Sequence, residues 1–307
     1  MSFIKCNLSS LVGAASLFFV VLLVPFCGQS SPSGDSLVAV RADDGGDDDK
    51  GKSTGPQSQL EGFRVVNLFP QEVPFGEGES LLFAIQYGLI YAGDASLEIR
   101  NIAVFDSTRA YHISSTARTN GTFDLIFKVR DRVDSFMDYD GLFSVRFEKH
   151  LREGKFSRDE KVEFDQKHHF ALYPDKKVPI PPGTQDFLSA VYYMRTLSLD
   201  VGMAVTLPNH TGGKNYPIFV KILRRERVKV PAGTFDCLVA EPVLETATIF
   251  QNKGKLTIWF TDDRVKMPVI LRSKVVIGAF EAVLKKYTLS PEMRELAPGK
   301  AGPTGGK

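Results

Sequence analysis

The amino-acid sequence predicts a mainly β protein, a curved antiparallel sheet or incomplete barrel with one helix, at about residues 184–199, packed on its concave face. Short stretches in which apolar residues alternate with others recur along most of the chain, and turn-forming residues separate them. One stretch breaks this pattern, because its apolar residues recur at the spacing of a helix. A helix this apolar needs a large hydrophobic surface to lie on, and strands flank it on both sides.

The first 30 residues have the layout of a secretory signal peptide. Lys5 supplies a short positive region, a nearly unbroken apolar run covers residues 11–26, and a small, polar stretch follows. The alternative is a retained membrane anchor, because the run is about as short as a membrane span can be. A third alternative is a lipid anchor on Cys27, although Phe26 stands where a lipoprotein signal normally carries a small residue. We therefore expect a periplasmic or exported protein.

Composition divides the rest of the chain into three parts. Residues 31–68 are rich in Asp, Gly and Ser and predict a disordered linker, because such a segment buries too little apolar surface to fold. Residues 69–290 predict a single β-rich domain, and residues 291–307 predict a flexible tail. The formal net charge of +2 gives no reason to expect a nucleic-acid partner. Once the signal is removed, Cys237 is the one cysteine left, so no internal disulfide is expected.

The expected strands follow one another through short turns, as in an antiparallel meander. Leu81, Phe83 and Ile85 alternate with less apolar neighbours, and Asn120-Gly121 is typical of a hairpin turn. The alternation resumes after the helix and continues to Tyr287. We count roughly a dozen strands in this pattern.

The helix is expected to begin with Thr184 as its N-cap and to end at Gly202 in a left-handed conformation. Pro181 and Pro182 end whatever precedes it. Its wide apolar face carries Phe187, Ala190, Val191, Tyr193, Met194 and Leu197.

No local motif in the sequence indicates a chemistry. It contains no nucleophile elbow, phosphate-binding loop, dinucleotide fingerprint or paired-histidine metal helix. His168 and His169 are adjacent, and in a strand they would point to opposite faces and could not chelate one ion together. We therefore assign no catalytic residue, no metal ligand and no cofactor. A pair of carboxylates that the sheet brings together from distant positions stays open as an alternative.

Two groups of side chains are candidates for binding. Tyr192 and Tyr193 on the helix, and Trp259 in a strand, would line an apolar cavity if the sheet curves without closing tightly. The alternative is that all three pack in the core. Arg225, Arg227 and Lys229 recur at period two, which predicts a cationic face on one strand. The alternative there is a solvated edge that charge protects from pairing.

Three stretches together resemble a known family. They are Asp186–Arg195, Val230–Cys237 and Ile258–Val269. As a set they are similar to domain of unknown function 3108, a family of exported bacterial proteins, and the similarity extends from about Pro74 to Tyr287. The resemblance implies a Gram-negative envelope protein with a curved β-sheet fold, and it supplies no catalytic residues.

Three functions agree with these observations. The first is a non-enzymatic periplasmic protein that binds an apolar or amphiphilic ligand, such as a lipid, or an envelope partner in its concave face. The second is a scaffold or assembly factor of envelope machinery that uses exposed edge strands. The third is a hydrolase acting on envelope polymers, which would need convergent carboxylates or a Ser-His pair in one cleft.

Overall fold

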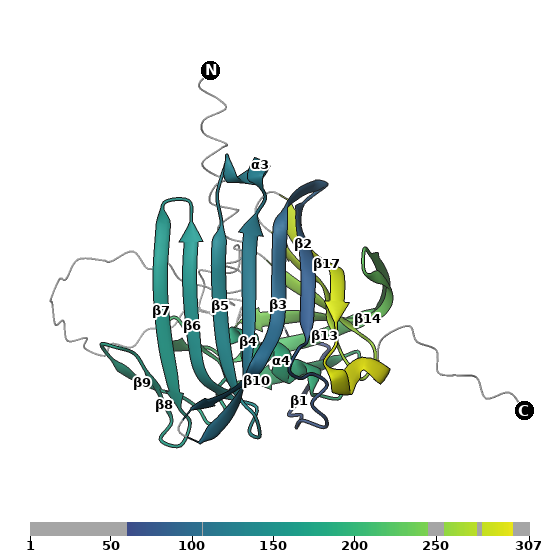
Figure 1. Ribbon diagram of the computed structural model, residues 1–307. Helices are drawn as coiled ribbons and strands as arrows, with labels where there is room; N and C mark the ends of the chain where they lie inside the picture. The colour runs from purple at the N-terminus through teal and green to yellow at the C-terminus, as the bar shows by residue number, and fades with distance from the viewer. Residues whose placement is uncertain (1–59, 106, 245–254, 275–277, 297–307) are drawn as a thin grey trace, which may run out of the picture.

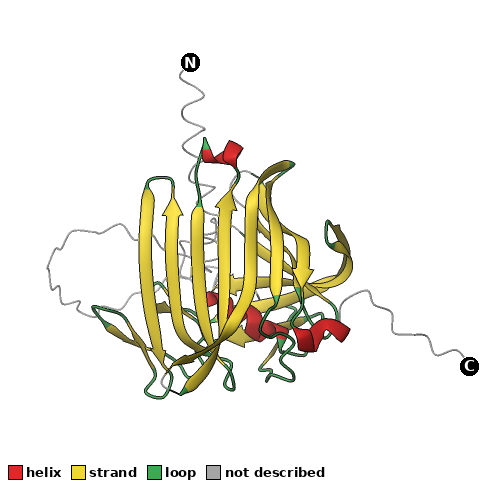
Figure 2. Cartoon of the chain, in the orientation of Figure 1, coloured by secondary structure: helices red, strands yellow, loops and turns green. Residues whose placement is uncertain are grey.

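The computed structural model describes residues 60–105, 107–244, 255–274 and 278–296. The predicted signal peptide, most of the predicted linker and the end of the tail lie outside these residues. Fifteen strands form one large sheet, whose neighbouring strands are antiparallel except for the pair β1 (Arg64–Val66) and β10 (Met203–Leu207). The sheet curves strongly and is not closed, and the helix α4 (Phe187–Arg195) lies within its curve (Figure 1; Figure 2). This confirms the predicted fold class.

The first half of the sheet is a meander in which each strand pairs with the next in sequence. Its strands alternate in direction, so the β2–β3, β4–β5 and β6–β7 turns lie at one end and the other turns at the opposite end. The strands are β2 Ser80–Tyr87, β3 Ile90–Phe105, β4 Thr108–Thr119, β5 Arg130–Asp138, β6 Ser144–Glu153 and β7 Phe156–Asp165.

The second half follows the helix and returns to the first strand of the meander. β17 pairs with β2, with Ala282 opposite Ile85, and this pairing joins the two halves into one sheet. The strands are β10 Met203–Leu207, β13 Ile218–Val230, β14 Gly233–Leu244, β15 Leu256–Thr261, β16 Pro268–Lys274 and β17 Ala279–Thr288.

Irregular strand pairing accompanies the strong curvature. Six of the strand pairs contain a register shift, for example between Ile99 and Ile102 in β3 and between Ile222 and Arg224 in β13. A β-bulge bends its strand and increases the local twist. Bulges spread around the sheet therefore give it the curve that a flat ladder would lack.

The two ends of the sheet approach each other without pairing as full strands. One end carries the short strands β8 Phe170–Leu172 and β9 Lys177–Pro179, and the other carries β1 Arg64–Val66. An isolated parallel bridge between Gln185 and Asn209 connects the two sides. A separate hairpin of β11 His210–Thr211 and β12 Lys214–Asn215 lies beside this bridge. The fold is thus an incomplete barrel. Its two sheet ends are connected by hydrogen bonds at this bridge and not by paired strands.

The helix is shorter than the sequence predicted. α4 spans Phe187–Arg195, and its N-cap is Asp186 rather than Thr184. Thr184 instead donates its hydroxyl to the carbonyl of Pro181, three residues before it. Gly202 has a φ of +83°, as expected for a left-handed glycine, but it lies in a turn beyond the end of the helix.

Three other local expectations differ from the structure. Seventeen strands are described, rather than roughly a dozen. β1 lies among residues 31–68 and a 3₁₀ helix, η1 Pro291–Leu296, among residues 291–307, and the division into linker, domain and tail stays a prediction. Asn120 does not form a hairpin turn, because its side chain caps a short helix, α3 Gly121–Asp124. His168 and His169 lie in the turn between β7 and β8 rather than in a strand.

Candidate functional site: the helix and the concave face

The N-terminal end of α4 is held to the sheet by buried hydrogen bonds. One carboxylate oxygen of Asp186 accepts the backbone N–H groups of Leu188 and Ser189, at 2.8 and 3.0 Å. Its other oxygen accepts the hydroxyls of Ser135, at 2.6 Å, and of Ser144. Burial raises the pKa of Asp186, while these four donors act in the opposite direction by favouring the ionised form. A single side chain therefore caps the helix and joins it to β5 and β6.

The C-terminal end of α4 is held by a buried ion pair. Arg195 donates to both carboxylate oxygens of Glu79, at 2.6 and 2.7 Å, and neither side chain has any solvent exposure. The hydroxyl of Tyr192 donates to the same carboxylate at 3.1 Å, and Arg195 Nε donates to the carbonyl of Val265 at 3.3 Å. Because Glu79 precedes β2 and Val265 lies between β15 and β16, the pair connects three parts of the fold.

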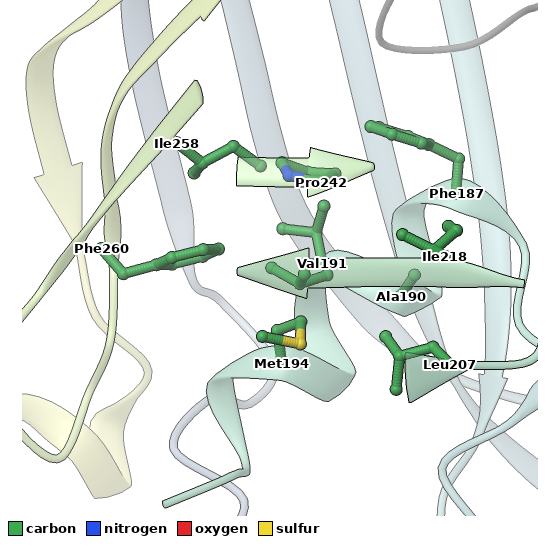
Figure 3. Close-up of a pocket in the computed structure, with 10 residues that line it drawn as sticks. Phe187, Ala190, Val191, Met194, Leu207, Ile218, Pro242, Ile258 and Phe260 are labelled. Carbon is green, nitrogen blue, oxygen red and sulfur yellow. The ribbon is translucent and has the colours of Figure 1, made fainter. Parts of the chain in front are cut away.

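An apolar cavity lies between α4 and four strands of the second half, β10, β13, β14 and β15 (Figure 3). Its volume is about 30 Å³, enough for about two water-sized groups. In Figure 3 the labelled side chains of α4 and those of the strands surround this space. All the lining residues are apolar, namely Phe187, Ala190, Val191, Met194, Leu207, Ile218, Val220, Pro242, Ile258 and Phe260.

The two tyrosines predicted to bind a ligand do not line this cavity. Tyr192 is fully buried, and its hydroxyl is taken up by Glu79. Tyr193 is half-buried and packs against the core, and burial raises its pKa. Tyr192 therefore contributes to the ion-pair network that fixes the helix.

Trp259 points away from the cavity. It is 2% exposed, and the alternation of β15 places it on the opposite face from Ile258 and Phe260, which line the cavity. Its ring lies 4.9 Å from the guanidinium of Arg272, which forms an ion pair with Glu281 on that same face. The structure thus does not bring Trp259 together with the two tyrosines, and a ligand-binding role for these three residues stays a prediction.

Charged side chains occupy the concave face of β6 and β7. Strand pairing places Lys149 opposite Val133 and Glu160 opposite Lys149, on the same face as Ser135. Glu160 lies 3.2 Å from Lys149 Nζ and 2.7 Å from Arg158 Nη2. Lys149 is 2% exposed, and its burial lowers its pKa although Glu160 acts against this. Glu160 thereby neutralises the buried charge of Lys149.

A pair of carboxyl groups lies on the same face. Asp131 and Glu153 are each 3% exposed, and Asp131 accepts the backbone N–H of Arg152 at 2.8 Å. Burial raises the pKa of Asp131 to about 6, with hydrogen bonds from Arg152 and Glu153 acting in the opposite direction. Such a group exchanges a proton near neutral pH, which is what a general acid or base requires. With so little exposure, however, neither carboxyl group is open to a polymeric substrate.

A buried histidine lies where the two ends of the sheet meet. The amide of Asn215 donates to the carbonyl of Pro179 at 2.8 Å, which turns the Asn215 oxygen towards His210 Nδ1, 2.7 Å away. His210 Nδ1 therefore carries the proton, and Nε2 accepts the hydroxyl of Tyr173 at 2.8 Å. The backbone N–H of Gly213 donates in turn to the Tyr173 oxygen at 2.9 Å. Burial raises the pKa of Tyr173 to about 12 and lowers that of His210, so both are neutral at pH 7.

The remaining candidates have structural roles in the described part of the chain. Among the described residues no group of three or more His, Cys, Asp or Glu side chains is placed to hold a metal ion. Burial raises the pKa of Cys237 to about 12, so the thiol is not activated as a nucleophile. Arg225 forms ion pairs with Asp262 and Asp200, at 2.7 and 3.0 Å, which offsets the predicted cationic face of β13.

The match to a family model decides what the chain is related to. Residues 82–285 match the family described as Protein of unknown function (DUF3108). The chain belongs to this family. The resemblance in the sequence is thereby confirmed. No curated protein matches the chain. Within the described residues no helix is long and apolar enough to cross a membrane.

Several solved structures resemble the DUF3108 chain in fold, at low sequence identity. One is a beta-barrel-like protein of DUF1849 from Brucella abortus, with 11% identity and a TM-score of 0.47 over 73% of this chain and 99% of that one. A "putative lipoprotein" from Parabacteroides distasonis has 10% identity and a TM-score of 0.35, over 71% and 100%. A "putative exported protein" from Bacteroides fragilis has 9% identity and a TM-score of 0.34, over 72% and 100%.

The helix side of the cavity carried a signal in the sequence, and the strand side did not. Phe187, Ala190, Val191 and Met194 belong to the predicted apolar face of the helix. The strand residues alternate, but alternation alone does not say which of two neighbouring residues faces inward when both are apolar. Ile258-Trp259-Phe260 is such a case, in which Ile258 and Phe260 line the cavity and Trp259 lies on the other face of the strand.

Proposed function

We propose that this DUF3108 protein is an exported, non-enzymatic protein that binds the apolar part of an amphiphilic ligand between α4 and strands β10, β13, β14 and β15. The observation that supports this proposal is the cavity beside the helix, which is lined by apolar side chains throughout. Ligand sites are mostly apolar and largely formed before the ligand arrives. The signal-like layout of residues 1–30 supports export.

The helix provides a rigid wall for such a site. Buried contacts at Asp186 and Arg195 hold both of its ends, so little of the binding free energy would be spent on ordering it. The cavity of about 30 Å³ is smaller than a lipid chain, and entry requires lining side chains to move. Met194 suits this, because its unbranched side chain adapts to irregular spaces. The cavity in the unliganded protein is then the place where the end of an apolar chain enters.

A change that fills the cavity tests the proposal. Val191→Phe places an aromatic ring among the side chains that line the cavity. The probe is a dansyl-labelled fatty acid, whose emission rises and shifts to the blue in an apolar site. We expect the wild-type protein to bind it and Val191→Phe to lower the affinity by about tenfold or more, because the ring removes the space for several methylene groups.

The matched control is the same substitution at an exposed valine. Val104→Phe, at a position 66% exposed on β3, should leave the affinity for the probe unchanged. Melting temperatures of both variants show whether the fold is retained. Equal affinity of the wild type and Val191→Phe, with both folded, would contradict the proposal, as would the absence of binding to the wild type.

A scaffold is a second candidate, and the outer edge of β7 favours it. β8 pairs only with residues 163–165 of β7, so residues 156–161 pair with β6 alone within the described part of the chain. A partner strand could add to this edge. The edge carries Arg158, Asp159 and Lys161, and natural proteins use such charges to prevent edge pairing. A co-purifying protein that Asp159→Val strengthens would support the scaffold.

A hydrolase is the third candidate, and the Asp131–Glu153 pair is the feature closest to its requirements. Both groups are buried, so a hydrolase activity at this pair requires the concave face to open. Hydrolysis of purified envelope polymers that Asp131→Asn abolishes would support it.

A further inference from the structure

Large apolar side chains are exposed at three neighbouring turns of the meander. They lie in or directly beside the β2–β3 turn, the loop that follows α3, and the β6–β7 turn. Leu89 is fully exposed and Leu125 is 89% exposed, so the fold buries almost nothing of either side chain. We call this set the apolar rim, and it consists of Leu89, Ile90, Tyr91, Leu125, Ile126 and Phe156.

The three turns form one continuous surface at one end of the sheet. In an antiparallel meander, alternate turns lie at the same end, and Figure 1 shows α3 and the β6–β7 turn together at the upper end. Hydrogen bonds connect the turns directly. The amide of Asn120 donates to the carbonyl of Tyr91 at 2.8 Å, and the N–H of Gly154 donates to the carbonyl of Lys128 at 2.7 Å. The rim is therefore held together by backbone and cap contacts rather than by its apolar side chains.

Folding does not explain why these positions are apolar. Single exposed apolar residues are ordinary on protein surfaces. Here, six of the ten large apolar residues that are exposed in the described part of the chain belong to the rim. A continuous exposed apolar patch indicates a surface that another body covers. The remaining four, Val65, Phe69, Val104 and Val201, lie elsewhere along the chain.

The charges beside the rim indicate which body that is. Lys128 is exposed in the loop that follows α3, and Lys155 is exposed in the β6–β7 turn. No described acidic side chain forms an ion pair with either lysine. The acidic residue of α3, Asp124, forms an ion pair with Arg130, at 2.5 Å between Asp124 Oδ2 and Arg130 Nη2. Asp94, near Tyr91, forms an ion pair with Lys285, at 2.7 Å between Asp94 Oδ1 and Lys285 Nζ. Apolar tips flanked by unpaired lysines match the interface of a bilayer that carries anionic lipids, because the tips enter the acyl boundary while the lysines meet phosphate.

We propose that the apolar rim docks this protein on the surface of an anionic lipid bilayer. Tyr91 suits such a position, because a tyrosine ring is stable where an apolar region meets water. The α4 end of the sheet, where Ser144 opens β6, would then face away from the membrane. The proposal does not depend on the cavity, and filling the cavity with Val191→Phe should leave docking unchanged.

A tryptophan placed on the rim reports its position directly, in the full chain. Trp259 is the only tryptophan and is buried, so it gives a constant background. We expect the emission of Leu125→Trp to shift to the blue on vesicles of phosphatidylcholine with phosphatidylglycerol, and brominated lipids to quench it. Val104→Trp, at the opposite end of β3, should show neither effect. This readout separates the rim from any insertion of the N-terminal segment, which both variants share.

Removal of the rim tests its contribution to affinity. The double variant Leu125→Ser, Ile126→Ser should lower partitioning onto these vesicles by about tenfold or more, because two exposed apolar side chains no longer enter the lipid. Lys128→Gln with Lys155→Gln should remove most of the dependence on phosphatidylglycerol and on salt. A Leu125→Trp emission that vesicles do not change would overturn the proposal. Self-association that protects Leu125→Trp without lipid would overturn it in favour of a second copy of this chain.

Discussion

Single buried side chains decide how firmly the helix is held, and the Arg195–Glu79 pair is the clearest case. Both residues lie beyond the reach of solvent, so a remaining partner cannot recover its hydration when the other is removed. We expect Glu79→Gln or Arg195→Met alone to lower the free energy of unfolding by about 3–5 kcal/mol. The double variant should cost clearly less than the sum of the two, measured by urea unfolding in a double-mutant cycle.

The exposed pair of Arg264 and Glu72 is the matched control for this cycle. It is also bidentate, with side chains that are 65% and 47% exposed. Removing Glu72 should cost about 1 kcal/mol or less, because water replaces the lost partner. Equal costs at the two pairs would show that burial does not set the strength of the Arg195 contact.

The raised pKa of Asp131 gives a second prediction at the scale of one residue. The folded-state pKa of about 6 lies above the ordinary value of 3.8, so the folded protein binds the proton more tightly than the unfolded chain. The stability that this group contributes is present below pH 4 and is lost as the pH rises towards 6. Asp131→Asn should therefore raise the free energy of unfolding at pH 7 relative to the wild type and have little effect at pH 4.

Urea unfolding at several pH values measures this difference. Asp159 provides the control, because hydrogen bonds from Arg152 and His150 lower its pKa. Asp159→Asn should leave the loss of stability between pH 4 and pH 6 in place. The prediction is wrong if the two variants have parallel stability profiles over this range.

At the scale of elements, the N-cap of α4 holds the start of the helix to two strands of the sheet. Asp186 satisfies two backbone N–H groups and two hydroxyls, all in the interior. Asp186→Ala removes the cap and leaves Ser135 and Ser144 without that acceptor, which should cost about 2–4 kcal/mol of unfolding free energy. Asn120→Ala removes the cap of α3, a four-residue helix without buried residues, and should cost about 1 kcal/mol. Hydrogen exchange of the α4 amides should rise in the first variant only.

The same helix shows how far the sequence could be read. Its presence, its apolar face and its place against the sheet followed from helical spacing and flanking strands. Its N-cap did not, because Asp186 is chosen by the hydroxyls of β5 and β6, which are far away in sequence. The pairing of β17 with β2 was likewise not predictable, since no local pattern states which distant strands pair. Local periodicity predicts elements, whereas caps, strand order and the inward face of an all-apolar strand depend on tertiary contacts.

For the whole molecule, hydrogen bonds rather than full strand pairing connect the two ends of the sheet. The helix is fixed, the meander is continuous, and the two sheet ends meet through the Gln185–Asn209 bridge and the contacts of His210. The apolar rim lies at the end of the meander where the β2–β3, β4–β5 and β6–β7 turns gather. The helix α4 is thus fixed at both ends, whereas the contact between the two sheet ends depends on His210, a titratable side chain. We call this contact the joint.

The His210 contact between the two sheet ends should become less stable at acid pH. Burial lowers the pKa of His210 in the folded protein below the ordinary value of 6.5, and Lys176 adds to this, while Asn215 and Glu160 act in the opposite direction. The unfolded chain therefore binds the proton more readily, so stability is lost as the pH falls below about 6.5. Protonated Nε2 can no longer accept the hydroxyl of Tyr173. We expect hydrogen exchange of residues 170–179 to rise at pH 5 relative to pH 7, beyond the intrinsic effect of pH. His210→Gln should remove this difference, whereas His168→Gln, at an exposed position whose ring hydrogen-bonds to Asp165, should retain it. Protection of residues 170–179 that stays constant in the wild type would show that His210 does not control the joint.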